Sequence, residues 1–229
     1  MLLSSTLAAA ALAIVAQDQV VLRAAPRDSA QQQTILSQGD SLEVRGEKMD
    51  FLQVYDHRRE RSGYVRASQV RQTTLSASEA PELLAVARFV RDTPGTESMG
   101  IAFVAAYLKA APATAIDAEP FDILGTLADR LARRASGASK AQEALLSTQV
   151  DTARHYGIGF IDIERDGRVR LCYEGEAFRR VLALSKQDVQ RAHAALAITR
   201  SDCIDPTLLP SKRQAVDQWF RWRLRRGAR

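Results

Sequence analysis

Hydrophobic residues recur along the chain at two different periods, and the change of period divides it near residue 73. From Val20 to Val70, short apolar runs alternate with polar residues, which is the period-two pattern of β-strands. The clearest apolar positions lie two residues apart: Leu42 and Val44, then Leu52 and Val54. Turn residues such as Gly39-Asp40 separate the runs. The pattern predicts a small β-barrel or sandwich over residues 17–72.

After a Ser- and Thr-rich linker at 73–80, apolar positions recur every three to four residues, as in amphipathic helices. The exception is 157–174, where two alternating runs flank Arg165-Asp166-Gly167, a strong hairpin signal. The predicted fold class is therefore α+β. An N-terminal small β-barrel is followed by a mainly helical domain over 81–229, with one β-hairpin inset at 157–174.

Residues 1–16, MLLSSTLAAAALAIVA, contain an apolar run that is too short to span a bilayer but has the length of a signal-peptide core. We expect a signal peptide cleaved after Ala16, although no Lys or Arg precedes the run. The alternative is a buried N-terminal helix. Export would make the protein periplasmic or secreted, and no other segment is long and apolar enough to predict a transmembrane helix.

The order of elements in the N-terminal part resembles the bacterial SH3-like (SH3b) domain of exported proteins. The family pattern begins with V-x-V-R-x-x-P and continues with a Gly-Asp turn, an aromatic residue before a strand, and Gly-aromatic-Val. The matching residues here are, in order, Val20–Pro26, Gly39-Asp40, Phe51–Val54 and Gly63–Val65. Phe51 and Tyr64 replace the family's usual Trp. The resemblance covers about a quarter of the chain, and it implies a five- or six-stranded barrel that binds cell-wall or peptide ligands.

The predicted ligand site follows from this resemblance and from the charge of one loop. Tyr55 ends one predicted strand and Tyr64 begins the next, with Arg58, Arg59 and Arg61 between them. Aromatic faces and arginine forks together would suit a ligand with a carboxylate or phosphate beside an apolar group. Two alternatives remain: the tyrosines face the barrel core, and the loop is only a solvated edge.

The two cysteines, Cys172 and Cys203, predict one disulfide if the chain is exported; two buried thiols are the alternative. A cysteine peptidase is not expected, because no histidine follows Cys203. The three histidines are scattered, so neither a metal site nor a cofactor is predicted.

Carboxylates gather around the hairpin and offer an enzymatic alternative: Glu164, Asp166, Glu174 and Glu176. At the C-terminal end, Trp219 and Trp222 share one face of a predicted helix over 212–226. That helix either docks internally or attaches to an anionic surface.

We therefore expect a non-enzymatic envelope binding or scaffold protein. Its partner would be a cell-wall component or an envelope protein, and its oligomeric state is not predicted. The runner-up is a peptidoglycan hydrolase or an accessory subunit of one. The formal charge of +5 is mildly basic, and nucleic acid is not an expected partner.

Overall fold

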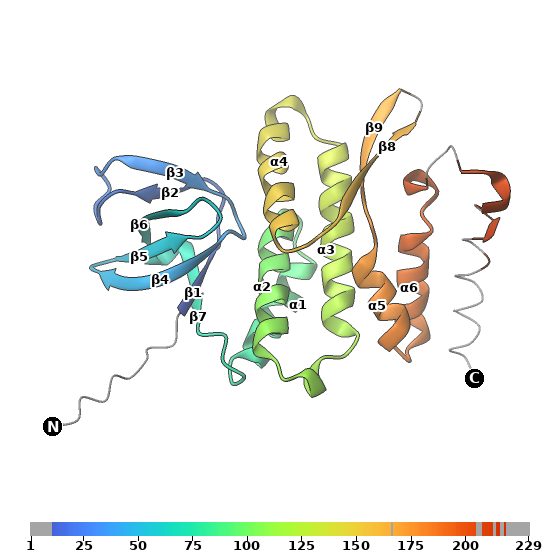
Figure 1. The fold of residues 1–229 in the computed structure, drawn as a ribbon, viewed down its shortest axis with the longest axis horizontal. Coiled ribbons are helices and arrows are strands. Elements are labelled where there is room, and N and C mark those ends of the chain that lie inside the picture. Colours follow the sequence, from blue (N-terminus) through green and yellow to red (C-terminus); the bar gives the residue numbers. More distant parts are fainter. Residues whose placement is uncertain (1–10, 166, 205–207, 213, 216–217, 219–229) are drawn as a thin grey trace.

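The computed structural model describes residues 11–165, 167–204, 208–212, 214–215 and 218. A β-sheet occupies one end of the molecule, helices lie in the middle and at the other end, and a separate two-stranded hairpin leans on the helices (Figure 1). The predicted α+β class is confirmed, as is the order of a strand-rich part followed by a mainly helical part.

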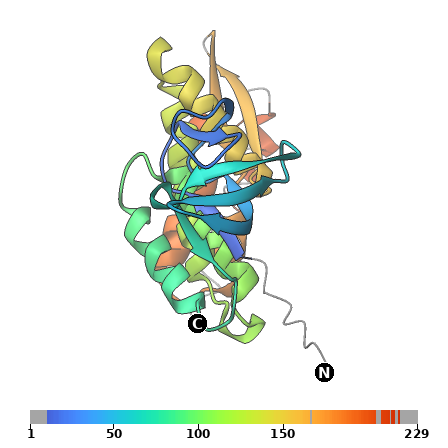
Figure 2. The ribbon, with the colours of Figure 1, turned by 90° about the vertical axis from the view of Figure 1, so that its left-hand side faces the viewer.

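The N-terminal strands form one antiparallel sheet in the order β3-β2-β6-β5-β4-β1-β7. The bounds are β1 (Ala11–Val15), β2 (Val20–Arg23), β3 (Gln32–Leu36), β4 (Ser41–Lys48), β5 (Phe51–Asp56), β6 (Arg61–Arg66) and β7 (Val70–Thr73). Figure 2 looks onto this end of the molecule and shows the strands crossing in front of the helices.

The sheet is open, so the prediction of a closed small barrel is wrong. β3 and β7 are the two ends of the strand order, and no pairing joins them among the residues that the structure describes. The seven strands also exceed the five or six expected from the resemblance. The physical reason lies at the β1–β7 end, where Ile14 packs into the core of the helices.

β1 lies inside the segment predicted to be a signal peptide, and it is an integral strand. Ile14 pairs with Ser41 of β4 on one side and with Arg71 of β7 on the other. Ala13, Ile14 and Val15 are each 0% exposed. Cleavage after Ala16 would remove this strand, so the expected boundary between residues 16 and 17 does not fit the fold, and neither does a buried helix at 11–15. Residues 1–10 lie outside the described part of the chain.

Six α-helices are complete within the described residues. Their bounds are α1 (Ala80–Arg91), α2 (Glu97–Ala110), α3 (Glu119–Ser136), α4 (Lys140–His155), α5 (Glu176–Leu184) and α6 (Asp188–Ile198). Helix α1 carries Pro81 in its first turn, where a missing N–H costs no helix bond. Further along, residues 210–212, 214–215 and 218 are helical, whereas Trp219 and Trp222 lie outside the described residues.

The predicted hairpin is present as β8 (Phe160–Arg165) and β9 (Arg168–Tyr173), paired antiparallel. It packs on α3, where the Ser136 hydroxyl accepts a hydrogen bond from the Leu171 N–H at 2.9 Å. A disulfide joins Cys172 to Cys203, as predicted, and ties β9 to the short 3-10 helix at 201–203.

Two apolar cores meet at β1. The first, between the strands, includes Ala13 and Val15, whereas the second, between α1, α2, α3 and α4, includes Ile14. Because successive side chains of a strand point to opposite faces, one short strand contributes to both cores. β1 therefore joins the sheet to the helices.

Replacing Ile14 by alanine tests this role of β1. We expect the free energy of unfolding to fall by about 2–5 kcal/mol, because the change leaves a cavity at a fully buried position. Ile35→Ala is the matched control, since Ile35 is 49% exposed on edge strand β3 and its truncation should cost less than about 1 kcal/mol. Equal midpoints of urea unfolding for the two variants would contradict the conclusion that β1 contributes side chains to both cores.

Reducing the disulfide provides a second test. The two cysteines are 31 residues apart, so the loop-entropy model gives roughly 3–4 kcal/mol of stabilisation. We expect Cys172→Ser with Cys203→Ser to lower the unfolding midpoint, and a reducing agent to lower that of the wild type but not that of the double variant. A wild type insensitive to the reducing agent would show that the disulfide contributes little.

Candidate functional site

Tyr55 and Tyr64 lie on the outer face of the sheet and are half-buried. Tyr55 faces Ser62 across the β5–β6 pair and Tyr64 faces Gln53, so the four side chains share one face. The guanidinium of Arg45 lies 4.0 Å from the centre of the Tyr55 ring. The alternative in which the tyrosines fill the core is therefore wrong, since the β5 and β6 core positions are others: Leu52, Val54 and Val65.

The arginines predicted beside these tyrosines turn to different partners. Arg58 donates to Asp40 Oδ1 at 3.2 Å and to Thr152 Oγ1 on α4 at 3.3 Å. Arg59 Nη2 lies 2.9 Å from Asp40 Oδ2, and its Nη1 donates to Asp56 Oδ2 at 2.7 Å. Asp40 and Asp56 are almost fully buried, so each carboxylate needs these partners.

Arg61 differs from its two neighbours because it stays on the surface, where its Nη1 donates to the Gln33 carbonyl at 2.7 Å. The five predicted residues therefore divide into two sets. Tyr55, Tyr64 and Arg61 lie on or beside the outer face, whereas Arg58 and Arg59 neutralise buried carboxylates, and Arg58 also reaches Thr152 on α4.

A close backbone contact also lies at the junction between the sheet and the helices. Gly39 has φ +87°, and a Cβ there would lie 2.5 Å from the Ser98 carbonyl oxygen on α2. Tyr156 donates its hydroxyl proton to the Gly39 carbonyl at 2.7 Å, and burial raises the pKa of Tyr156 to about 12. Gln149 on α4 donates to Asp18 at 2.8 Å. The sheet and the helices therefore form one continuous body.

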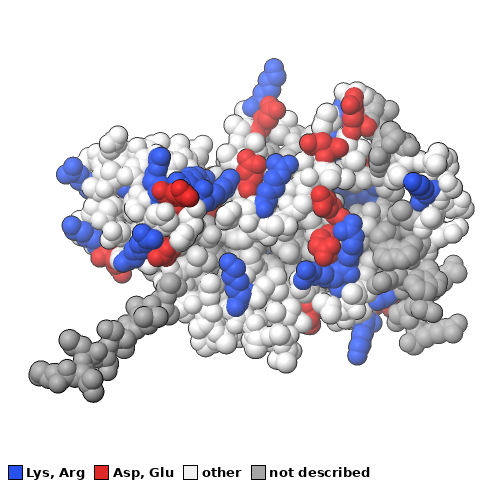
Figure 3. Space-filling model, in the orientation of Figure 1, with Lys and Arg blue, Asp and Glu red and all other residues white. Residues whose placement is uncertain are grey.

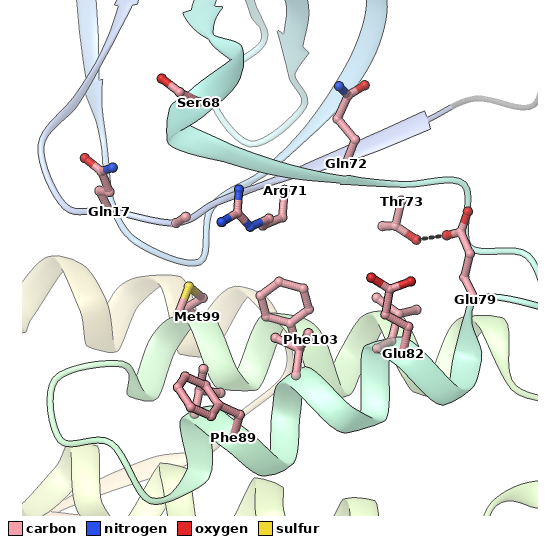
Figure 4. Close-up of a pocket in the computed structure, with 14 residues that line it drawn as sticks. Gln17, Ser68, Arg71, Gln72, Thr73, Glu79, Glu82, Phe89, Met99 and Phe103 are labelled. Atoms are coloured by element: carbon pink, nitrogen blue, oxygen red, sulfur yellow. Dashed lines mark hydrogen bonds between the residues drawn. The ribbon is translucent and has the colours of Figure 1, made fainter.

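A cleft of about 600 Å³ opens beside this junction, between strand β7 and helices α1 and α2 (Figure 4). Its apolar lining comes from the two helices: Leu83, Val86, Phe89, Val90, Met99 and Phe103. Phe89 is 78% exposed at the rim, whereas Phe103 is 4% exposed in the floor. Its polar lining comes from the strand side and from the start of α1: Gln17, Ser68, Arg71, Gln72, Thr73, Glu79 and Glu82. A cleft of this volume that combines apolar and polar walls is of the size of ligand sites.

Two opposite charges line the cleft without neutralising each other. Arg71 extends from β7 between the strand and the helices, and Glu82 rises from the first turn of α1 toward β7 (Figure 4). Within the described part of the chain, neither side chain has an ion-pair or hydrogen-bond partner. Both charges are therefore available to a ligand.

Glu79, at the same end of the cleft as Glu82, is already engaged. Its carboxylate accepts hydrogen bonds from the Thr73 hydroxyl, from the Thr74 N–H at 2.9 Å and from the Thr74 hydroxyl at 2.6 Å. These bonds, above all the one from Thr73, lower the pKa of Glu79. Glu79 fixes the start of α1 against the end of β7 and adds negative charge at that end.

Sequence reasoning missed this cleft because Arg71 and Glu82 lie on either side of a linker-like segment. Within the sequence, Glu82, Val86 and Phe89 follow a helical i, i+4, i+7 spacing that places them on one face. That spacing was the available signal, but nothing in the pattern shows that β7 lies opposite.

The carboxylates of the enzymatic alternative lie elsewhere. Glu164 is on β8, Glu174 follows β9, and Glu176 begins α5 beside Arg179 and Arg180, at 3.5 and 3.4 Å. Asp166 lies outside the described residues. In the part of the chain that the structure describes, no group of three or more His, Cys, Asp or Glu side chains is placed to hold a metal ion.

Charged side chains of both signs are interspersed over the sheet and the helices on the face shown in Figure 3. Many belong to ion pairs, such as Arg88 with Glu119 at 2.6 Å. None of the described helices is long and apolar enough to span a membrane.

Comparison of the chain with protein-family models, with curated proteins and with solved structures finds no match.

Because Arg58 and Arg59 pair with buried carboxylates, we expect their substitution to lower the stability of the protein. Arg58→Ala combined with Arg59→Ala leaves Asp40 and Asp56 buried without their cations, so we expect a loss of roughly 3 kcal/mol in the free energy of unfolding. Arg61→Ala, which removes one exposed hydrogen bond, should cost less than about 1 kcal/mol. Urea unfolding at pH 7 measures both values. An unchanged unfolding midpoint for the double variant would show that the two arginines do not stabilise the fold, and would support their predicted role in ligand binding.

Proposed function

We propose that this protein is a non-enzymatic binding or scaffold protein of a bacterial envelope, and that it holds its ligand in the cleft between β7 and α1–α2. The observation that carries the proposal is the pair of unpartnered charges, Arg71 and Glu82, which face a cleft with an apolar helix wall. A charge that already has a protein partner offers less to a ligand, whereas these two gain from one.

The envelope location is supported by the disulfide, because disulfides persist in oxidising compartments. The resemblance of the N-terminal strands to SH3-like domains of exported proteins agrees with it. That resemblance also favours cell-wall or peptide material as the ligand.

The outer face of the sheet is a second contact surface in this proposal. Tyr55 and Tyr64 are half-buried there, and Arg61 lies at the end of the same hairpin. Rigid aromatic faces bind planar or apolar groups at low entropic cost.

The alternative function is peptidoglycan hydrolysis by the hairpin carboxylates. It requires two carboxyl groups set for acid and base roles across a scissile bond. Glu176 lies at a smaller pocket of about 200 Å³, together with Tyr173 and Arg180. One assay with cell-wall material separates the two functions.

Phe89→Ala tests the proposed function. We expect the purified wild type to co-sediment with bacterial cell-wall sacculi and to release no soluble fragments. The variant should bind at least about fivefold more weakly, because an exposed aromatic side chain at the rim loses its contact with the ligand.

Val189→Ala is the matched control, since Val189 is 82% exposed on α6, away from the cleft, and neither truncation should alter stability by more than about 0.5 kcal/mol. Binding that survives in Phe89→Ala would place the ligand elsewhere. Release of fragments that is lost in Glu174→Gln or Glu176→Gln would establish the hydrolase instead.

A further inference from the structure

The rim of the cleft is the open edge of a sheet. β7 ends the strand order and pairs only with β1 among the described strands. The Ala16 N–H donates to the Gln69 carbonyl at 2.9 Å, directly beyond the last pair of the β1–β7 register. Since hydrogen-bonded and non-hydrogen-bonded pairs alternate in an antiparallel ladder, Arg71 and Thr73 direct their backbone groups toward β1.

Val70 and Gln72, which alternate with Arg71 and Thr73, direct backbone groups away from β1. By the same alternation, the N–H and C=O of Gln72 and the C=O of Val70 point away from β1, at the open edge. The Val70 N–H is already used, because it donates to the Ala67 carbonyl. The edge therefore presents three backbone groups in a row to an incoming strand.

The side chains along this edge face the cleft in alternation. Arg71 pairs with Ile14, which lies in the core of the helices, so Arg71 and Thr73 point toward the helices. A strand added to β7 would place its own alternate side chains between Arg71 and α1. The cleft would then receive every second side chain of the added strand.

The charges in the cleft specify which side chains these are. At the Thr73 end lie two carboxylates, Glu79 and Glu82, and toward the Arg71 end lies the unpartnered guanidinium (Figure 4). Beyond Arg71 the helix wall is apolar, with Met99 and Phe89, while Gln17 and Ser68 lie on the strand side. In an antiparallel strand, a cation would enter opposite Thr73, and a carboxylate would follow two residues later opposite Arg71.

We propose that the ligand of the cleft is an extended peptide that adds to β7 as an antiparallel strand. It carries an ammonium side chain toward Glu82, a carboxylate side chain two residues later at Arg71, and an apolar side chain after a further two residues at Phe89. This inference rests on the proposed function, because it names the ligand class of the same cleft. Recognition by strand addition derives affinity from the backbone and specificity from alternate side chains.

A labelled peptide with the core Lys-Thr-Glu-Thr-Leu is the probe, and fluorescence anisotropy with the full-length protein is the measurement. Its reversed sequence, Leu-Thr-Glu-Thr-Lys, has the same composition and keeps Glu opposite Arg71, but in antiparallel pairing it brings Leu to Glu82 and Lys to Phe89. A third peptide carries an N-methyl group on the Thr between Lys and Glu. That Thr lies opposite Gln72, and its N–H would donate to the Gln72 carbonyl.

We expect the first peptide to bind at least about tenfold more tightly than either of the others, because each change removes paired charges or a backbone bond. Arg71→Ala should weaken its binding at least about tenfold, and Glu82→Gln at least about threefold. Arg27→Ala, between β2 and β3, and Glu47→Gln, on β4, are the matched controls; both residues are exposed and do not line the cleft, so these variants should bind as the wild type does.

Equal affinity for the first and the N-methylated peptide would overturn strand addition, and equal affinity for the reversed peptide would overturn the assigned direction. No saturable binding of any probe up to about 1 mM, a free energy near −4 kcal/mol, would overturn the inference. If Phe89-dependent binding to sacculi persisted in that case, the proposed function would stand without it. Loss of sacculus binding as well would remove both.

Discussion

The burial of β1 on both faces is the constraint on which the rest of the structure depends. A strand with helices on one side and a sheet core on the other cannot present polar side chains in either direction, which explains the unbroken apolar composition of Ala11–Val15. The two-sided packing also fixes β7, because β1 is the only described strand with which β7 pairs. The position of the cleft follows from that pairing.

Polar contacts then fix the angle between sheet and helices. Asp40 accepts hydrogen bonds from Arg58 and from the Thr152 hydroxyl, the latter at 3.1 Å, and Thr152 belongs to α4. Buried ion pairs add little net stability over apolar contacts of equal size, but they permit only one geometry. At this junction they orient the two parts, while Ile14 adds apolar contact with the core of the helices.

Local patterns predicted much of this fold because they encode local structure. The Arg165-Asp166-Gly167 turn, the helix breaks and the cysteine pair each act over a few residues or in a known compartment, and the hairpin, the helices and the disulfide are present. The apolar run before Ala16 predicted a signal peptide, whereas the structure has Ala11–Val15 as β1, because a strand buried on two faces and a signal-peptide core have the same composition. Arg58 and Arg59 illustrate a further limit: a basic loop shows its charge in the sequence, but not the buried carboxylates that accept it. The cleft joins β7 to α1 in space, and a single sequence carries no signal for that kind of proximity.

In the proposed mode of binding, the cleft divides recognition between a strand and a helix, and this division bears on how the binding preference of the protein would evolve. Its strand wall offers backbone groups that any residue other than proline at position 72 would leave in place. Its helix wall offers Glu82, Val86 and Phe89, of which Glu82 and Phe89 are exposed and Val86 is half-buried. Substitutions along that stripe can alter which sequence is accepted while the ladder that holds a ligand stays the same. New binding preferences would therefore arise from substitutions on one helix face, where exposed positions can change with little loss of stability.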